Sequence, residues 1–161
     1  MRSGLTARDG RRQEKLPPPG AAAPRSSSAI CYVTLHPEGM VAYQETFVQR
    51  DQHRIYVRNY PGSEPAIILM HGFPDNVHLY DRLFPHLSPP RRVVLFDFLG
   101  WGSSDKPPGY PYTTDNQVGD LDAVITQLGL GQVVLVAHDA SGPPAIDWAL
   151  AHPGAWPGWC C

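Results

Sequence analysis

The stretch VVLVAHDASG, residues 133–142, decides the fold of this 161-residue chain. Its first five residues are all apolar, which is typical of a short strand that is buried on both faces. A strained turn from a strand into a helix needs small residues around its apex, because the chain doubles back on itself there. Ala137, Ser141 and Gly142 have small side chains and place Asp139 at that apex. We therefore predict that the Asp139 carboxylate projects from the top of a sheet.

A helix is expected to follow this turn directly. Proline is tolerated in the first turn of a helix, so Pro143 and Pro144 fit a helix that begins there and continues through residues 146–151. The positive end of such a helix would favour a negative charge on Asp139. Taken alone, the same aspartate could simply cap the helix, which is a frequent use of this residue type.

The residues upstream predict four more strands and two more helices. Two strands, 46–50 and 54–60, surround a polar turn, and the apolar runs 66–70 and 93–96 are typical of buried strands. Leucines at helical spacing predict a helix over residues 77–87, and an amphipathic pattern predicts another over 114–128 that Gly129 ends. Short buried strands that alternate with helices indicate an α/β fold, with a mostly parallel sheet and helices on both faces.

In such a sheet, ligands bind beyond the carboxyl ends of the strands. His71, Asp97 and Asp139 each follow a predicted strand directly. We expect Asp97 to hold the turn that follows it rather than to take part in chemistry.

Four segments together resemble the α/β-hydrolase superfamily, in the branch with an aspartate nucleophile that includes epoxide hydrolases and haloalkane or haloacid dehalogenases. They are HGFPD at 71–75, DFLGWGSSDKP at 97–107, AHDASG at 137–142 and DWALAHP at 147–153. The resemblance covers about residues 40–153 and implies the amino-terminal half of an α/β-hydrolase fold. The carboxy-terminal strands and the lid of that fold would be missing.

The resemblance also implies a set of site residues. Asp139 would be the catalytic nucleophile, and the backbone N–H groups of Phe73 and Ala140 would form an oxyanion or leaving-group hole. Four residues would support the site: His71, Gly72, His138 and Trp101. We expect His138 to pack beside the nucleophile strand and Trp101 to pack within its loop.

An aspartate at the apex favours particular substrates. A carboxylate is ionised at neutral pH and attacks without a base. Its attack on an sp3 carbon gives an ordinary ester that water can hydrolyse, whereas attack on an acyl carbon would give an anhydride. Epoxides and carbon–halogen bonds are therefore the expected targets. Haloalkane dehalogenases usually carry tryptophan where this chain has Ala140, and HGFPD is closer to the epoxide hydrolases, which favours an epoxide.

A serine esterase that uses Ser141 is an alternative, although it would put Asp139 and Pro143 at positions that need small residues.

The catalytic histidine and its acid come late in the chain of this superfamily. Only 22 residues follow Asp139, and His152 is expected to point away from the apex.

The ending WPGWCC, residues 156–161, stands where an apolar strand is expected, so we infer a frameshift near Ala155 that truncated a longer hydrolase. The chain alone would then be inactive or incomplete, and the alternative is a non-catalytic interaction fragment. Strand 133–137 would have an exposed edge prone to self-association.

Composition sets the remaining limits. Hydrophobic residues make up 42% of the chain, which is enough for a packed core, and residues 40–161 are expected to form it after a disordered leader at 1–39. A net charge of −2 argues against nucleic acid, and no apolar run approaches the roughly 20 residues that cross a membrane. The three cysteines form no disulfide framework or metal motif, which fits the cytoplasm. We therefore expect a small-molecule substrate and no metal or organic cofactor.

Overall fold

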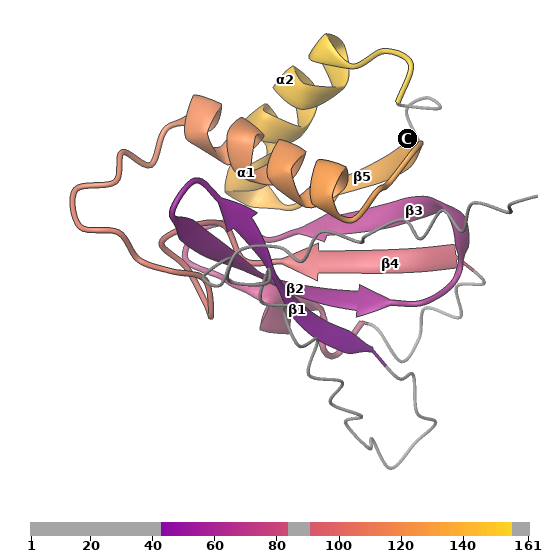
Figure 1. Ribbon diagram of the computed structural model, residues 1–161, viewed down its shortest axis with the longest axis horizontal. Helices are drawn as coiled ribbons and strands as arrows, with labels where there is room; N and C mark the ends of the chain where they lie inside the picture. Colours follow the sequence, from indigo (N-terminus) through magenta and orange to yellow (C-terminus); the bar gives the residue numbers. More distant parts are fainter. Residues whose placement is uncertain (1–42, 84–90, 156–161) are drawn as a thin grey trace, which may run out of the picture.

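A five-stranded sheet carries two α-helices in the computed structural model, which describes residues 43–83 and 91–155 (Figure 1). The strands lie in the order β1-β2-β4-β3-β5. In chain order the elements are β1 (Gln44–Arg50), β2 (His53–Tyr60), β3 (Ser63–Met70), the 3-10 helix η1 (Val77–Tyr80), β4 (Arg91–Phe96), α1 (Thr114–Gln127), β5 (Val133–Ala137), the 3-10 turn η3 (Asp139–Ser141) and α2 (Gly142–Ala151). The expected leader at 1–39 and the ending at 156–161 lie outside the described residues.

The sheet is mixed, and its parallel part contains the three strands that lead to the predicted site. β3 lies between β4 and β5 and pairs with both in parallel, whereas β2 pairs antiparallel with β1 and with β4. All five predicted strands are present, each within a few residues of its expected bounds. Because β3, β4 and β5 run in one direction, their carboxyl ends meet at one edge of the sheet.

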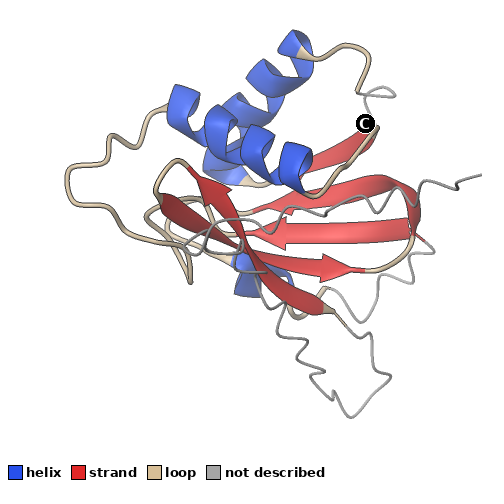
Figure 2. Ribbon diagram, in the orientation of Figure 1, coloured by secondary structure: helices blue, strands red, loops and turns tan. Residues whose placement is uncertain are grey.

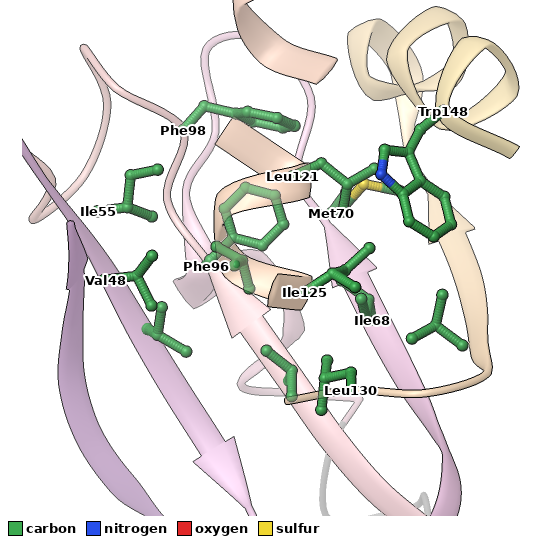
Figure 3. Close-up of a cluster of buried hydrophobic side chains, with 14 of the residues drawn as sticks. Val48, Ile55, Ile68, Met70, Phe96, Phe98, Leu121, Ile125, Leu130 and Trp148 are labelled. Atoms are coloured by element: carbon green, nitrogen blue, oxygen red, sulfur yellow. The ribbon is translucent and has the colours of Figure 1, made fainter. Parts of the chain in front are cut away.

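The main hydrophobic core lies between the sheet and the two α-helices, which cover the same face (Figure 2). Side chains from three elements meet there: Phe96 from β4, Leu121 from α1 and Trp148 from α2 are each at most 1% exposed (Figure 3). The indole N–H of Trp148 donates to Asp122 Oδ1 at 3.1 Å and so links α2 to α1. None of the described helices is long and apolar enough to cross a membrane.

The opposite face of the sheet is covered by η1 and a smaller cluster of buried side chains. Val77 and Tyr80 from η1 pack against residues of β2, β3 and β4. Arg58 of β2 is buried and donates to Asp81 Oδ1 at 2.7 Å, just after η1 ends. This ion pair and the Tyr80 contacts fix η1 against the sheet beside the carboxyl end of β3.

The helix predicted over residues 77–87 was wrong in its described part, where only the short 3-10 helix η1 forms. The leucine spacing that suggested it does not mark a buried face, because Leu79 and Leu83 are 37% and 46% exposed. The buried residues are instead Val77 and Tyr80, three positions apart, which is the repeat of a 3-10 helix. Residues 84–90 lie outside the described part of the chain.

A buried carboxylate on α1 holds the loop after β4. Asp120 Oδ2 accepts the backbone N–H of Leu99 at 3.0 Å, and Oδ1 accepts the Tyr110 hydroxyl at 3.4 Å. The Nε of Arg50 lies 3.5 Å from Oδ1 but makes no hydrogen bond. Burial outweighs these partners and raises the pKa of Asp120 to about 6.

This raised pKa predicts how the stability of the fold depends on pH. The folded chain holds the Asp120 proton more tightly than the unfolded chain does, so the contribution of Asp120 to stability is complete below about pH 4 and is lost as pH rises through about 6. Asp120→Asn removes this titration and keeps an acceptor for the Leu99 N–H. Relative to the variant, the wild-type free energy of unfolding should fall by about 2 kcal/mol between pH 4 and pH 7. Urea unfolding across that range measures the difference, and parallel curves for the two chains would contradict the assignment.

Candidate active site

Asp139 occupies the apex of a sharp turn between β5 and α2. Its φ of 51° lies in the left-handed region, which is uncommon for a residue other than glycine and marks a strained backbone. The side chain is exposed at the carboxyl end of β5. The structure therefore has the turn that the small residues around Asp139 predicted, with the carboxylate at its tip.

Backbone N–H groups from both predicted positions stabilise the charge of this carboxylate. The Phe73 N–H, in the loop after β3, donates to Asp139 Oδ2 at 3.0 Å. The pKa of Asp139 lies below its usual value, mainly because of this bond. A hydrogen bond from the Ala140 N–H is the second cause. The site thus joins the end of β3 to the turn after β5, and its carboxylate is ionised at neutral pH.

Gly72 permits this close approach of the two segments. A Cβ at position 72 would lie 2.6 Å from the Asp139 Cβ and 2.8 Å from the His138 carbonyl oxygen. Real Cβ atoms essentially never approach other atoms so closely, so only glycine fits between the loop and the turn.

Ser141 supports the turn from below and is buried. Its hydroxyl lies 3.1 Å from the Met70 carbonyl oxygen and 2.9 Å from that of His138, and it also accepts the His138 N–H at 2.9 Å. With 1% of its surface exposed, Ser141 cannot reach a substrate. The alternative of a serine esterase that uses Ser141 was therefore wrong.

His71 is a structural residue in the site. Both of its ring nitrogens contact the backbone: Nε2 accepts the Phe98 N–H at 3.2 Å, and Nδ1 lies 2.8 Å from the Gly72 carbonyl oxygen. An acceptor Nε2 and a donor Nδ1 describe a neutral imidazole, so the Asp97 Oδ1 at 4.0 Å makes no ion pair with it. His71 thereby ties the loop after β3 to the loop after β4.

Asp97 holds two loops rather than facing the apex. Its Oδ1 accepts the Val77 N–H and its Oδ2 accepts the Ser103 N–H, both at 2.7 Å. A Cβ at Gly102 would overlap Asp97 Oδ2, and the φ of Gly102 is 50°, so the turn needs glycine there. These contacts agree with the loop role expected of Asp97.

The two remaining predicted support residues are more exposed than the others. The His138 side chain is exposed, so the expectation that it packs beside the strand was wrong; it follows the end of β5, where Val136 and Ala137 are exposed as well. Trp101 is half-buried, with its ring centroid 6.3 Å from that of His71 and 4.8 Å from that of Tyr112. Its contacts with Tyr112 and His71 agree with packing inside the loop region.

His152 lies at the other end of α2 from Asp139, about 15 Å along a ten-residue helix. Its ring stacks on Trp148 with a centroid distance of 4.4 Å, and its Nδ1 lies 2.8 Å from the Trp148 carbonyl oxygen. It faces away from the apex, as expected. Within residues 43–83 and 91–155, no group of three His, Cys, Asp or Glu side chains could hold a metal ion.

Sequence reasoning missed how much of the site rests on the Met70 carbonyl at the end of β3. This oxygen accepts the Tyr80 hydroxyl at 2.8 Å, the His138 N–H at 3.2 Å and the Ser141 hydroxyl at 3.1 Å. A backbone acceptor leaves no mark in the sequence. The buried Tyr80, which needs a partner for its hydroxyl, was the one available signal.

Known proteins of two hydrolase types are similar to this chain. Fluoroacetate dehalogenase from Burkholderia sp is 38% identical over 96 residues, which cover 57% of this chain and 32% of the relative. Epoxide hydrolase 2 from Siraitia grosvenorii is 37% identical over 94 residues, covering 57% of this chain and 30% of the relative. The crystal structure of the haloalkane dehalogenase DatA from Agrobacterium tumefaciens C58 superposes with a TM-score of 0.65 and 29% identity, over 71% of this chain and 38% of that one.

The similarity spans one part of those proteins, since this chain covers about a third of the length of the curated relatives it matches. The family model for the alpha/beta hydrolase fold matches residues 65–155, which include β4, β5, both α-helices and every predicted site residue. With more than half of its residues matched in this way, the chain belongs to the alpha/beta hydrolase fold family.

Proposed function

We propose that Asp139 is the nucleophile of a hydrolase that acts on epoxide or carbon–halogen bonds through a covalent aspartyl ester. The observation that carries this proposal is a carboxylate at a left-handed apex whose Oδ2 accepts the Phe73 N–H at 3.0 Å. The names of the similar proteins, two dehalogenases and an epoxide hydrolase, support these two bond types. In this proposal residues 40–161 form the core domain and residues 1–39 precede it.

The first step needs only the carboxylate and a reactive carbon. Because the Phe73 N–H holds Oδ2, we assign Oδ1 as the attacking atom. With an epoxide, a bond forms between Oδ1 and an sp3 carbon while the ring C–O bond breaks, and the freed alkoxide takes a proton from water. With an alkyl halide, the same bond forms and the halide ion leaves.

The second step, hydrolysis of the ester, needs a base to activate water. Oδ2 would then be the carbonyl oxygen, and the N–H groups of Phe73 and Ala140 would stabilise the negative charge that develops on it. Among the described residues, no histidine hydrogen-bonds Asp139, and the two ring nitrogens of His71 already contact the backbone. An ester formed on this chain should therefore persist.

Covalent labelling tests the proposal directly. Because cysteine thiols react with the same reagents, the test uses the full chain with Cys31, Cys160 and Cys161 replaced by serine. We expect its incubation with styrene oxide or 1-bromobutane to add one epoxide or one butyl group to the intact protein. Peptide mapping by mass spectrometry should place the added mass on Asp139. Labelling that is spread over exposed carboxylates, or no labelling with either reagent, would favour a non-catalytic fragment.

The pH dependence of labelling provides a second test. The lowered pKa of Asp139 keeps the nucleophile ionised, so the labelling rate should stay constant from pH 8 down to about pH 5 and fall only below the usual aspartate pKa of about 3.9. A nucleophile that depends on a histidine base would instead lose its rate around pH 6.5. Rates measured by intact mass in buffers of equal ionic strength distinguish the two profiles.

A further inference from the structure

Tyr80 is a buried tyrosine at the end of η1 that the proposed reaction does not use. Its hydroxyl donates to the Met70 carbonyl oxygen at 2.8 Å. The residue is 6% exposed, so this hydroxyl cannot touch a substrate. Burial raises the pKa of Tyr80 to about 12, so the hydroxyl keeps its proton at neutral pH and remains a donor. Any role of the hydroxyl in the site must therefore act through Met70.

Three donors contact the Met70 carbonyl oxygen, which has only two lone pairs. The Tyr80 hydroxyl is the nearest, at 2.8 Å, and occupies one of them. The other lone pair is shared by the His138 N–H at 3.2 Å and the Ser141 hydroxyl at 3.1 Å. Both of these donors have a second acceptor that lies closer, at 2.9 Å: the Ser141 Oγ for the His138 N–H, and the His138 carbonyl oxygen for the Ser141 hydroxyl.

The two shorter bonds join His138 to Ser141 and so close the turn around Asp139. The Ser141 N–H adds a third bond to the His138 carbonyl oxygen, at 3.2 Å. A left-handed φ such as the 51° of Asp139 persists only where the surrounding structure holds it. These bonds between the residues that flank the apex are therefore part of what keeps the carboxylate in place.

We propose that Tyr80 is a positioning residue for Asp139, a role that rests on the function proposed for Asp139 above. By occupying the Met70 carbonyl oxygen, the Tyr80 hydroxyl directs the Ser141 proton to the His138 carbonyl oxygen. Without that hydroxyl, the Ser141 proton can turn to Met70, and one bond across the apex is lost. The turn can then move away from the Phe73 N–H that holds the carboxylate.

Tyr80→Phe tests this role, because it removes the hydroxyl and keeps the ring. In the chain whose three cysteines are replaced by serine, labelling of Asp139 by 1-bromobutane should slow by about 10-fold, the cost of a displacement of about 0.5 Å. Tyr56→Phe is the matched control: it removes a hydroxyl from the same buried cluster, one that accepts the Arg58 Nε–H at 3.1 Å. That variant should label at the parent rate.

The pH profile of labelling distinguishes a displaced carboxylate from a weakened fold. The Phe73 N–H is the main cause of the lowered pKa of Asp139. If the turn moves away from it in Tyr80→Phe, the midpoint of the labelling profile should rise toward the usual aspartate pKa of about 3.9. The Tyr56→Phe midpoint should stay at the parent value. A slower Tyr80→Phe chain with an unchanged midpoint would assign the loss to the fold and overturn the positioning role.

A double-mutant cycle tests whether Tyr80 acts through the Ser141 proton. Ser141→Ala removes that proton, so adding Tyr80→Phe to it should slow labelling no further. Independent losses would instead multiply, to about 100-fold if each is about 10-fold. Such multiplication, or a Tyr80→Phe chain that labels at the parent rate, would overturn the positioning role and leave the function of Asp139 standing. A parent chain that does not label at Asp139 would reject both.

Discussion

Asp139→Asn is expected to abolish covalent labelling by styrene oxide and by 1-bromobutane. The amide that replaces the carboxylate carries no charge and is a very poor nucleophile, so the labelling rate should fall by about 1,000-fold or more. The fold should be kept, because asparagine tolerates the left-handed conformation that residue 139 adopts with φ of 51°. The side-chain oxygen of asparagine can still accept the Phe73 N–H. Intact mass spectrometry over a time course measures the loss.

Asp147→Asn is the matched control for this substitution. Asp147 is an exposed aspartate on α2, so its replacement changes the net charge by the same amount without touching the turn. We expect labelling of Asp147→Asn at the wild-type rate, with the same modified peptide. Equal labelling of the Asp139→Asn chain would show that another carboxylate reacts, and the role proposed for Asp139 would have to be abandoned.

The strands and the turn at Asp139 could be predicted because each depends on local sequence. Continuous apolar runs marked β3, β4 and β5 as strands. The carboxyl-terminal parts of β3 and β4 are buried as expected, whereas the burial predicted for β5 was wrong in its second half, because Val136 and Ala137 are exposed. Small residues on either side of Asp139 marked the turn, because a sharp reversal excludes larger side chains. The positions of the two N–H groups, at Phe73 and Ala140, followed from the family resemblance, and the contact of both with the carboxylate agrees with it.

What the sequence could not predict depends on contacts between distant segments. The leucines at 79 and 83 have the spacing of a buried helical face, yet both are exposed, because η1 is fixed by Val77, Tyr80 and the ion pair after it. The pKa of Asp120 likewise depends on its burial beneath the loop after β4, whose Leu99 lies 21 positions earlier in the chain. Periodicity along one segment contains no information about which segment covers it.

Gly72 illustrates how such a distant contact controls the site, and Gly72→Ala should have the second largest effect. Its methyl group would lie 2.6 Å from the Asp139 Cβ and 2.8 Å from Asp139 Oδ2, so the loop and the turn must move apart. A shift of about 1 Å in a reacting group can cost about 100-fold in rate, and we expect a loss of labelling of that order. Overpacking of this kind should also lower the free energy of unfolding by about 1–3 kcal/mol.

Gly131→Ala distinguishes this steric effect from a general cost of replacing glycine. A Cβ at Gly131 meets no atom within 4 Å, so that variant should label at the wild-type rate and melt at the wild-type temperature. Thermal unfolding followed by circular dichroism, together with labelling rates, compares the two variants. If Gly72→Ala labels as fast as Gly131→Ala, the turn tolerates displacement from the loop after β3. The Phe73 N–H would then not be needed to hold the carboxylate, because any movement that admits the methyl group must lengthen the 3.0 Å bond between them.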